Sequence, residues 1–328
     1  MPRRPAKLSN CYVPLPLPTA GGPGGDALAP GRGNARPDGR ATGHELRQLC
    51  METSVISGAM GSCLVELGHT KVLVEAHLCQ AAGNGPGGRG SSSSNEATND
   101  IGSLRCHARH APHVGIDRVS QRSSSLLPLD GSGGNKGGPS AAPSASAGKM
   151  NQELAVRESD LSRGIAAALL PVVVLEKYPK SSVVVNATVL QDDGSCLSVA
   201  ILAASMALVD ARVELRDLVA SCTVAVATTK GDGEEGGGDD VVYLADPTHR
   251  ESSGEGERVA LICLAMTPNQ KEVTLWNQSG RLTSEMASHA MDLCRDGCRT
   301  MHRFMREAWV SSLSAAASDG DEEMAPSQ

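Results

Sequence analysis

Two neighbouring runs in the first half of the chain alternate between apolar and polar positions. Residues 61–67 are followed by residues 70–78, where small apolar side chains occupy every second position (Val72, Val74 and Ala76). A period of two is typical of a strand with one buried face, and the Gly-His pair between the two runs fits a tight turn. The pattern therefore predicts a β-hairpin.

Three further segments are predicted to be helices, the first because its apolar residues recur at spacings of three and four. Residues 150–178 form the first, which we expect to end before Pro179. Residues 197–211 are apolar nearly all round, which predicts a buried helix. A third, amphipathic helix begins with Thr283 as its N-cap and continues to residue 311. Strands are predicted at 104–111, 182–190, 218–227, 241–245, 258–266 and 272–276.

Stretches rich in glycine, serine and proline separate these elements. We expect a flexible leader over residues 1–35, disordered insertions over about 80–103, 117–149 and 230–240, and an acidic disordered tail over 312–328. Because the first two insertions surround one short strand, they decorate a domain rather than link two domains. The sequence therefore predicts a single α/β domain over residues 36–311.

Composition narrows the possible functions. Only six residues are aromatic (two Trp, three Tyr and one Phe), which nearly excludes base stacking on aromatic platforms. The net charge of −7 divides into +5 over residues 1–150 and −12 over the rest, so any contact with RNA is local or shared with partners. No apolar run approaches the length of a membrane span, and the start lacks the apolar segment of a signal peptide. We expect an intracellular protein whose ten cysteines are free and mostly buried.

Six short phrases occur in one order along the chain. They are Arg36-Pro37-Asp38-Gly39-Arg40 with Glu45-Leu46-Arg47, the run from Gly61 to Val72, Tyr178-Pro179-Lys180-Ser181, Val189-Leu190-Gln191-Asp192-Asp193-Gly194, Leu208-Val209-Asp210-Ala211 and Leu215-Arg216-Asp217-Leu218. With these phrases the chain resembles the RNase PH family, whose members form six-subunit rings that trim RNA from its 3′ end with phosphate. The resemblance implies a single RNase PH-like α/β domain of mixed sheets packed with helices, similar to domain two of ribosomal protein S five.

A narrower resemblance comes from the C-terminal half. The phrases are Leu244-Ala245-Asp246-Pro247-Thr248, Met266-Thr267-Pro268-Asn269-Gln270 and Leu282-Thr283-Ser284-Glu285. They are similar to a eukaryotic RNA exosome core subunit of the mRNA transport regulator three type. This resemblance implies a hetero-hexameric ring of RNase PH-like subunits, cap subunits with oligonucleotide-binding and KH-type domains, a hydrolytic exoribonuclease, single-stranded RNA in the channel, and a location in the nucleus, including the nucleolus, and the cytoplasm.

Phosphorolysis needs a cationic pocket for phosphate and a carboxylate close to the scissile bond. The resemblance implies a Gly-Ser/Thr-Arg step after the Gln-x-Asp phrase, and here Leu197 stands at the arginine position after Ser195 and Cys196. It also implies an aspartate where the chain has Arg258, with Glu257 one residue away. We therefore expect no catalytic residue in this subunit.

The function expected from these losses is structural. The subunit would help to form the RNA channel and bind its neighbours, and so support 3′-to-5′ RNA processing and degradation. One alternative is an active phosphate-dependent 3′-to-5′ exoribonuclease in which Glu257 and another arginine replace the missing groups. A free-standing tRNA-trimming enzyme of the RNase PH type is another, and it would form a homohexamer. Asp192 and Asp193 could act as paired carboxylates, but Asp-Asp-Gly between a strand and a helix favours a turn with an N-cap.

Cysteine and histidine cluster by residue type at Cys106, His107, His110 and His113. On a strand, Cys106 and His110 share one face while His107 and His113 share the other, so the four do not converge as zinc requires. Cys294 and Cys298, one helical turn apart, fit a core better than a metal site. None of the glycine-rich stretches has the pattern of a nucleotide-binding loop. We expect neither metal nor cofactor.

Arginine supplies the candidate RNA contacts. Arg105 and Arg109 share one face of the short strand, and Arg118 and Arg122 follow. They form either a solvated edge or a basic surface that contacts RNA phosphates. Arg157 stands where related subunits have a pair of RNA-contacting arginines, but Val156 occupies the partner position. Arg105, Arg109 and Arg157 are therefore the expected RNA-binding residues.

Overall fold

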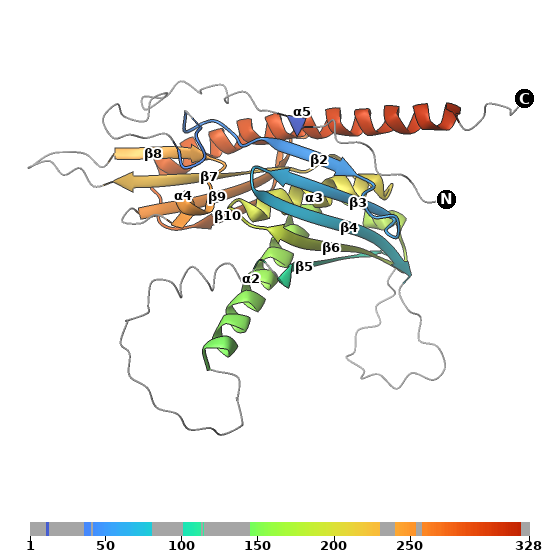
Figure 1. The fold of residues 1–328 in the computed structure, drawn as a ribbon, viewed down its shortest axis with the longest axis horizontal. Coiled ribbons are helices and arrows are strands. Elements are labelled where there is room, and N and C mark those ends of the chain that lie inside the picture. Colours follow the sequence, from blue (N-terminus) through green and yellow to red (C-terminus); the bar gives the residue numbers. More distant parts are fainter. Residues whose placement is uncertain are drawn as a thin grey trace, which may run out of the picture.

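The computed structural model describes residues 11–12, 36–40, 42–80, 101–112, 114, 145–229, 240–253 and 258–322 (Figure 1). The strands are β1 (Cys11–Tyr12), β2 (Leu49–Thr53), β3 (Gly61–Leu67), β4 (Thr70–Gln80), β5 (Ser103–His110), β6 (Ser181–Gln191), β7 (Ala220–Thr229), β8 (Asp240–Ala245), β9 (Arg258–Thr267) and β10 (Glu272–Ser279). The helices are α2 (Ala145–Leu169), the 3-10 turn η1 (Leu175–Lys177), α3 (Cys196–Asp210), α4 (His249–Ser253) and α5 (Ser284–Glu322).

These strands form two sheets. The first has the order β1-β2-β3-β4-β6-β5, and the second has the order β10-β9-β7-β8. Every pair is antiparallel except β5 and β6, which are parallel and joined through α2. A parallel pair needs such a crossover connection. As a result the C-terminal ends of β5 and β6 lie at the same edge of the sheet, beside the start of α3.

The core lies around α3, which packs between the sheets against β3, β4 and β7 (Figure 1). All residues from Val199 to Leu208 in this helix are completely buried. The small side chains along it let the helix approach both sheets closely. At Gly61 on β3 an added Cβ would lie 2.1 Å from the backbone nitrogen of Ala211, so only glycine fits there. Residues 220–227 of β7 are also buried throughout, because α5 packs on the second sheet as well.

Most predicted elements are confirmed within one to three residues. The predicted hairpin of β3 and β4 is present, with Leu67 paired to Thr70, and Gly68 in its turn has a φ of +57°, in the left-handed region that glycine adopts without strain. The buried helix, the amphipathic helix and all six further strands are present. The expected insertions lie largely outside the described residues, but helix α2 already begins at Ala145, inside the insertion expected over residues 117–149. None of the described helices is long and apolar enough to cross a membrane.

Four expectations differ from the structure. The helix predicted over 150–178 ends at Leu169, because Pro171 cannot donate the next backbone hydrogen bond and disfavours helical geometry at the residue before it. Helix α5 continues to Glu322, into the segment expected as a disordered tail, through an alanine-rich stretch that favours a helix but carries no apolar period. Strand β1 lies inside the segment expected as a flexible leader and pairs with β2. Cys50 is disulfide-bonded rather than free.

Candidate functional site

The turn between β6 and α3 is the place where the resemblance puts a phosphate site. Asp192 forms an Asx-type turn, with its Oδ1 accepting the backbone N–H of Gly194 at 3.1 Å. Gly194 has a φ of +93°, and an added Cβ would lie 2.5 Å from the carbonyl oxygen of Pro247. Ser195, the N-cap residue, is left-handed (φ 56°) and donates its hydroxyl to that same carbonyl, so it does not cap the helix. The expected turn is confirmed, and the expected carboxylate N-cap is wrong.

Two buried side chains hold this turn: Arg47, shortly before β2, and Thr70, the first residue of β4. Thr70 donates its hydroxyl to the carbonyl of Gly194 at 2.8 Å and accepts the N–H of Asp193 at 3.1 Å. Arg47 donates to the carbonyl of Asp193 at 3.1 Å and to that of Gly194 at 3.2 Å. Both residues are buried, so the backbone of the turn is fixed rather than open to a ligand.

Arg47 also forms a two-point ion pair with Asp246. Its Nε donates to Oδ2 at 2.8 Å and one Nη donates to Oδ1 at 2.7 Å, with exposures of only 5% and 2% for the two residues. Burial alone would raise the pKa of Asp246, but the charge and hydrogen bonds of Arg47 outweigh it and hold that pKa below its ordinary value. The buried guanidinium of Arg47, which contacts the turn, is therefore neutralised by a carboxylate of its own chain.

Two more buried arginines, Arg36 and Arg40, form ion pairs beside the pair of Arg47 and Asp246. Arg36 donates to Glu251 at 2.7 Å and 2.9 Å, and Arg40 donates to Asp38 at 2.6 Å and to the carbonyl of Asp246 at 3.0 Å. Burial opposes ionisation of Glu251, yet hydrogen bonding and charge from Arg36 lower its pKa. These contacts join the segment 36–47 to the β8–α4 connection, so the arginines and acids form a structural clamp. The sequence showed these arginines only as phrases of the resemblance, because their partners lie about 200 positions further along the chain.

Leu197 stands at the expected arginine position. It packs against α2 at Gly164, where an added Cβ would lie 2.7 Å from Cδ1 of Leu197. It also contacts the main core as a partly buried side chain. Arg258 begins β9, and Glu257 lies outside the described residues. Where the resemblance implies a phosphate-binding arginine, the chain therefore has an apolar contact between two helices.

The cysteine and histidine residues do not form the cluster that their order suggests. Along β5, His107 is exposed, whereas Cys106 and His110 point to the opposite, inner face. His113 lies outside the described residues. Cys294 and Cys298 are completely buried, and burial raises their pKa well above the ordinary value, as for thiols packed in a core.

The three predicted RNA-binding arginines lie on two elements. Arg105 and Arg109 are exposed on the outer face of β5, beside Val184 and Thr188 of β6, and have no ion-pair partner among the described residues. On the outer edge of this strand, the backbone N–H of Ala108 donates to the hydroxyl of Ser162 at 2.8 Å, and that of His110 donates to the carboxylate of Glu158 at 2.7 Å. Both acceptors belong to α2. The edge is thus closed, while its two arginines remain available to an anion.

Arg157 differs from the pair on β5. It is exposed on α2, but it forms an ion pair at 2.9 Å with Glu153 one turn earlier, which is also exposed. Part of its charge is therefore compensated within the helix. Its role in RNA binding remains a prediction, as do those of Arg105 and Arg109.

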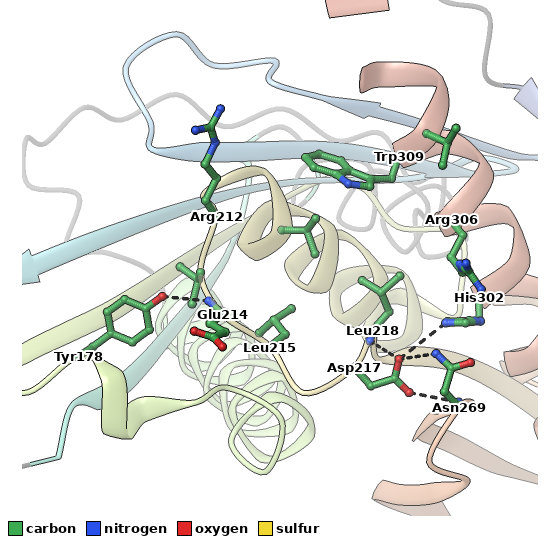
Figure 2. A pocket seen from close by; sticks show the side chains of 13 residues that line it. Tyr178, Arg212, Glu214, Leu215, Asp217, Leu218, Asn269, His302, Arg306 and Trp309 are labelled. Atoms are coloured by element: carbon green, nitrogen blue, oxygen red, sulfur yellow. Dashed lines mark hydrogen bonds and ion pairs between the residues drawn. The ribbon is translucent and has the colours of Figure 1, made fainter. Parts of the chain in front are cut away.

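A groove of about 650 Å³ lies at the opposite end of α3 (Figure 2). One wall is α5, with His302, Arg306, Trp309 and Val310, and the other is the segment after α3, from Arg212 to Leu218. Asp217 organises its floor by accepting hydrogen bonds from the backbone of Leu218 and from the backbone and side chain of Asn269, at 2.8 Å to 3.1 Å. No local sequence pattern predicts this groove, because its walls come from separate elements.

The side chains that line the groove differ in charge and burial. Burial lowers the pKa of His302, and its Nε2 is 3.9 Å from Asp217, too far for a hydrogen bond. Trp309 is half-buried, Val310 is 64% exposed, and Arg212 and Arg306 have no partner among the described residues. The groove therefore offers an apolar wall next to exposed positive charge.

Comparisons with known proteins agree with this architecture. The sequence profile of the 3′ exoribonuclease family, domain 1 (RNase PH), matches residues 45–214. The human exosome complex component MTR3 is 30% identical over 81% of this chain and 83% of its own length. The exosome complex component Rrp41 of Thermococcus gammatolerans is 29% identical over 83% of this chain and 87% of its own length.

Solved structures show the same fold. The crystal structure of rice Rrp46 superimposes with a TM-score of 0.54 at 18% identity, over 83% of this chain and 98% of that one. A structure of the Archaeoglobus fulgidus exosome with RNA bound to the active site also gives 0.54, at 22% identity, over 83% of this chain and 93% of that one. With two sheets around a buried central helix and a family match over more than half of its length, the chain belongs to the RNase PH family of 3′ exoribonucleases.

Proposed function

We propose that this chain is a non-catalytic, structural subunit of an RNA exosome ring. The observation that carries the proposal is the turn before α3. There Leu197 packs into α2, and Arg47 is neutralised by Asp246 at 2.7 Å. A phosphate dianion beside an RNA backbone needs uncompensated positive charge, and neither residue supplies it.

The similarity to exosome components supports the assembly part of this proposal. In it, the chain pairs with other RNase PH-like subunits in a hetero-hexameric ring and helps to form a channel for single-stranded RNA. Cap subunits with oligonucleotide-binding and KH-type domains cover one side, and a separate hydrolytic exoribonuclease cuts the RNA. The assembly acts in the nucleus, including the nucleolus, and in the cytoplasm.

Two surfaces fit this role. The exposed arginines of β5 can contact RNA phosphates without catalysing cleavage. The groove beside α5, with Trp309 and Val310 at its rim, offers apolar area next to Arg212 and Arg306 for a neighbouring chain. Aromatic residues and arginines are enriched in protein interfaces.

An active phosphorolytic exoribonuclease is the second candidate, favoured by the similarity to archaeal Rrp41 and to an exosome with RNA bound to its active site. The two are separated by incubating the purified full chain with 5′-labelled single-stranded RNA and inorganic phosphate, beside an active RNase PH family enzyme. We expect no nucleoside diphosphate from the wild type or from Leu197→Arg. Phosphate-dependent release of nucleoside diphosphates by the wild type would overturn the structural role.

A further inference from the structure

Three side chains from the ends of β5, β6 and α3 meet at the edge where β5 and β6 end. His110 is the last residue of β5, Asp192 follows β6 directly, and Cys196 is the first residue of α3. One ring nitrogen of His110, one carboxylate oxygen of Asp192 and Sγ of Cys196 all lie within 4.8 Å of one another. The parallel pairing of β5 with β6 creates this meeting, because it brings both strand ends to one edge.

His110 carries an unsatisfied polar atom. Its side chain is only 6% exposed, and its buried Nδ1 has no hydrogen-bond partner among the described residues. Glu158 accepts the backbone N–H of His110 at 2.7 Å, and its Oε1 lies 3.6 Å from Nδ1. A buried ring nitrogen without a hydrogen bond carries a free-energy cost. Such a cost is removed when the ring binds a cation through one nitrogen and turns the other toward the carboxylate.

The donor set selects the class of cation. A thiolate, an imidazole and a carboxylate are the ligands that Zn²⁺ takes in proteins, whereas Mg²⁺ and Ca²⁺ take oxygen ligands. Metal–ligand bonds of about 2.0–2.3 Å in a tetrahedron place ligand atoms about 3.5 Å apart. The three donor atoms already lie within 4.8 Å of one another, so binding requires only a small approach of the side chains. The positive end of α3 stabilises the negative charge that Cys196 carries as a ligand.

We propose that His110, Asp192 and Cys196 bind one Zn²⁺, with Glu158 orienting the imidazole. Three protein ligands leave the fourth tetrahedral position for water or another small donor. The site differs from the sequence cluster at residues 106–113, because it uses His110 with two residues from beyond β6. It does not depend on whether the chain catalyses phosphorolysis or joins a ring.

The test uses the purified full chain after treatment with a chelator and removal of the chelator. Titration with Zn²⁺, followed by calorimetry and metal analysis, should give one equivalent per chain. Titration with Co²⁺ should give sulfur-to-metal charge transfer and tetrahedral ligand-field bands. We expect Cys196→Ser to abolish the charge-transfer band and His110→Gln to weaken Zn²⁺ binding at least about 100-fold, while Glu158→Gln weakens it about 10–100-fold.

Matched controls come from the same sheet. His107→Gln removes a histidine from the opposite face of β5, and Cys79→Ser removes an exposed cysteine from β4. Both should bind Zn²⁺ as the wild type does. If Cys196→Ser fails to fold, Asp192→Asn, which keeps the acceptor for Gly194, should weaken binding at least about tenfold in its place. The proposal is overturned if the wild type binds no Zn²⁺ at micromolar concentration, or if binding and the Co²⁺ spectrum are unchanged in the ligand variants.

Discussion

Leu197 of α3 occupies the space that a side chain at Gly164 of α2 would need. An added Cβ at residue 164 would lie 2.7 Å from Cδ1 and 3.2 Å from Cδ2 of Leu197. The two helices can approach only because residue 164 has no side chain. The residue at the expected arginine position is therefore part of the packing of α2 on α3.

This contact predicts coupling between the two positions. Alanine favours a helix interior over glycine by about 1 kcal/mol, but in Gly164→Ala the new methyl group must displace Leu197. In the Leu197→Ala background the space is open, so the same substitution should be more favourable by about 1 kcal/mol. The free energies of unfolding of the wild type, both single variants and the double variant measure this coupling. Additive effects, within about 0.3 kcal/mol, would contradict the contact.

The ion pair of Arg47 and Asp246 should be the most sensitive charged pair in the described structure. Asp246→Asn leaves a buried arginine opposite a neutral amide, so we expect the free energy of unfolding to fall by about 3–5 kcal/mol. Asp292→Asn, which removes the exposed partner of Arg295, is the matched control and should change it by less than about 1 kcal/mol. Chemical denaturation of the three proteins makes the comparison. Equal small effects would show that the buried pair does not stabilise the fold.

Acid should weaken the same clamp. The pKa values of Asp246 and Glu251 are lowered in the folded chain, so the unfolded chain binds more protons as the pH falls. Their contribution is complete above the ordinary carboxyl pKa values and is lost as the pH drops below about 4–5. Denaturation midpoints between about pH 6 and pH 3 should fall for the wild type and fall less steeply for Asp246→Asn. If the denaturation midpoints of the wild type and Asp246→Asn fall in parallel, Asp246 is not a source of the stability lost in acid.

Protonation of His302 should add a separate step at higher pH. Burial lowers its pKa in the folded chain, so stability is lost as the pH falls below about 6.5. His302→Gln should remove the part of the pH dependence between about pH 6.5 and pH 5 and leave the carboxyl part unchanged. The same denaturation series measures it. If His302→Gln keeps the pH dependence of stability seen in the wild type, the group that titrates in this range is not His302.

The arginines of β5 should contribute to RNA binding through phosphate contacts. Arg105→Glu and Arg109→Glu should each weaken binding of single-stranded RNA by the assembled complex and reduce the slope of log K against log salt by about 0.7. Arg157→Glu should have a smaller effect, since Glu153 already compensates its charge. Arg299→Glu on α5, an exposed arginine paired with Asp296, is the control. Unchanged binding in both β5 variants would leave these arginines as a solvated edge.

The fold could largely be predicted from the sequence, because its elements follow local periodicity. The hairpin at β3 and β4 and the buried helix α3 have patterns that tertiary structure does not override. The apolar period over 150–178 continues past Pro171, so periodicity alone predicts a longer helix than the one that ends at Leu169. Helix α5 was predicted too short because an alanine-rich end has helix propensity without an apolar period.

The site was predicted less completely. Leu197 at the arginine position was visible in the sequence, because the loss concerns one residue in a recognisable phrase. The pair of Arg47 with Asp246 was not visible, since nothing local connects residues 199 positions apart. The cluster of His110, Asp192 and Cys196 and the groove beside α5 were also missed, because each combines residues from separate elements.

The central claim, a structural role in a mixed ring, is tested most directly by native mass spectrometry of the tagged chain purified gently from its own cells. The account predicts a hetero-oligomer in which this chain occurs once, together with other RNase PH-like subunits and cap subunits. A homohexamer or a lone monomer would contradict it.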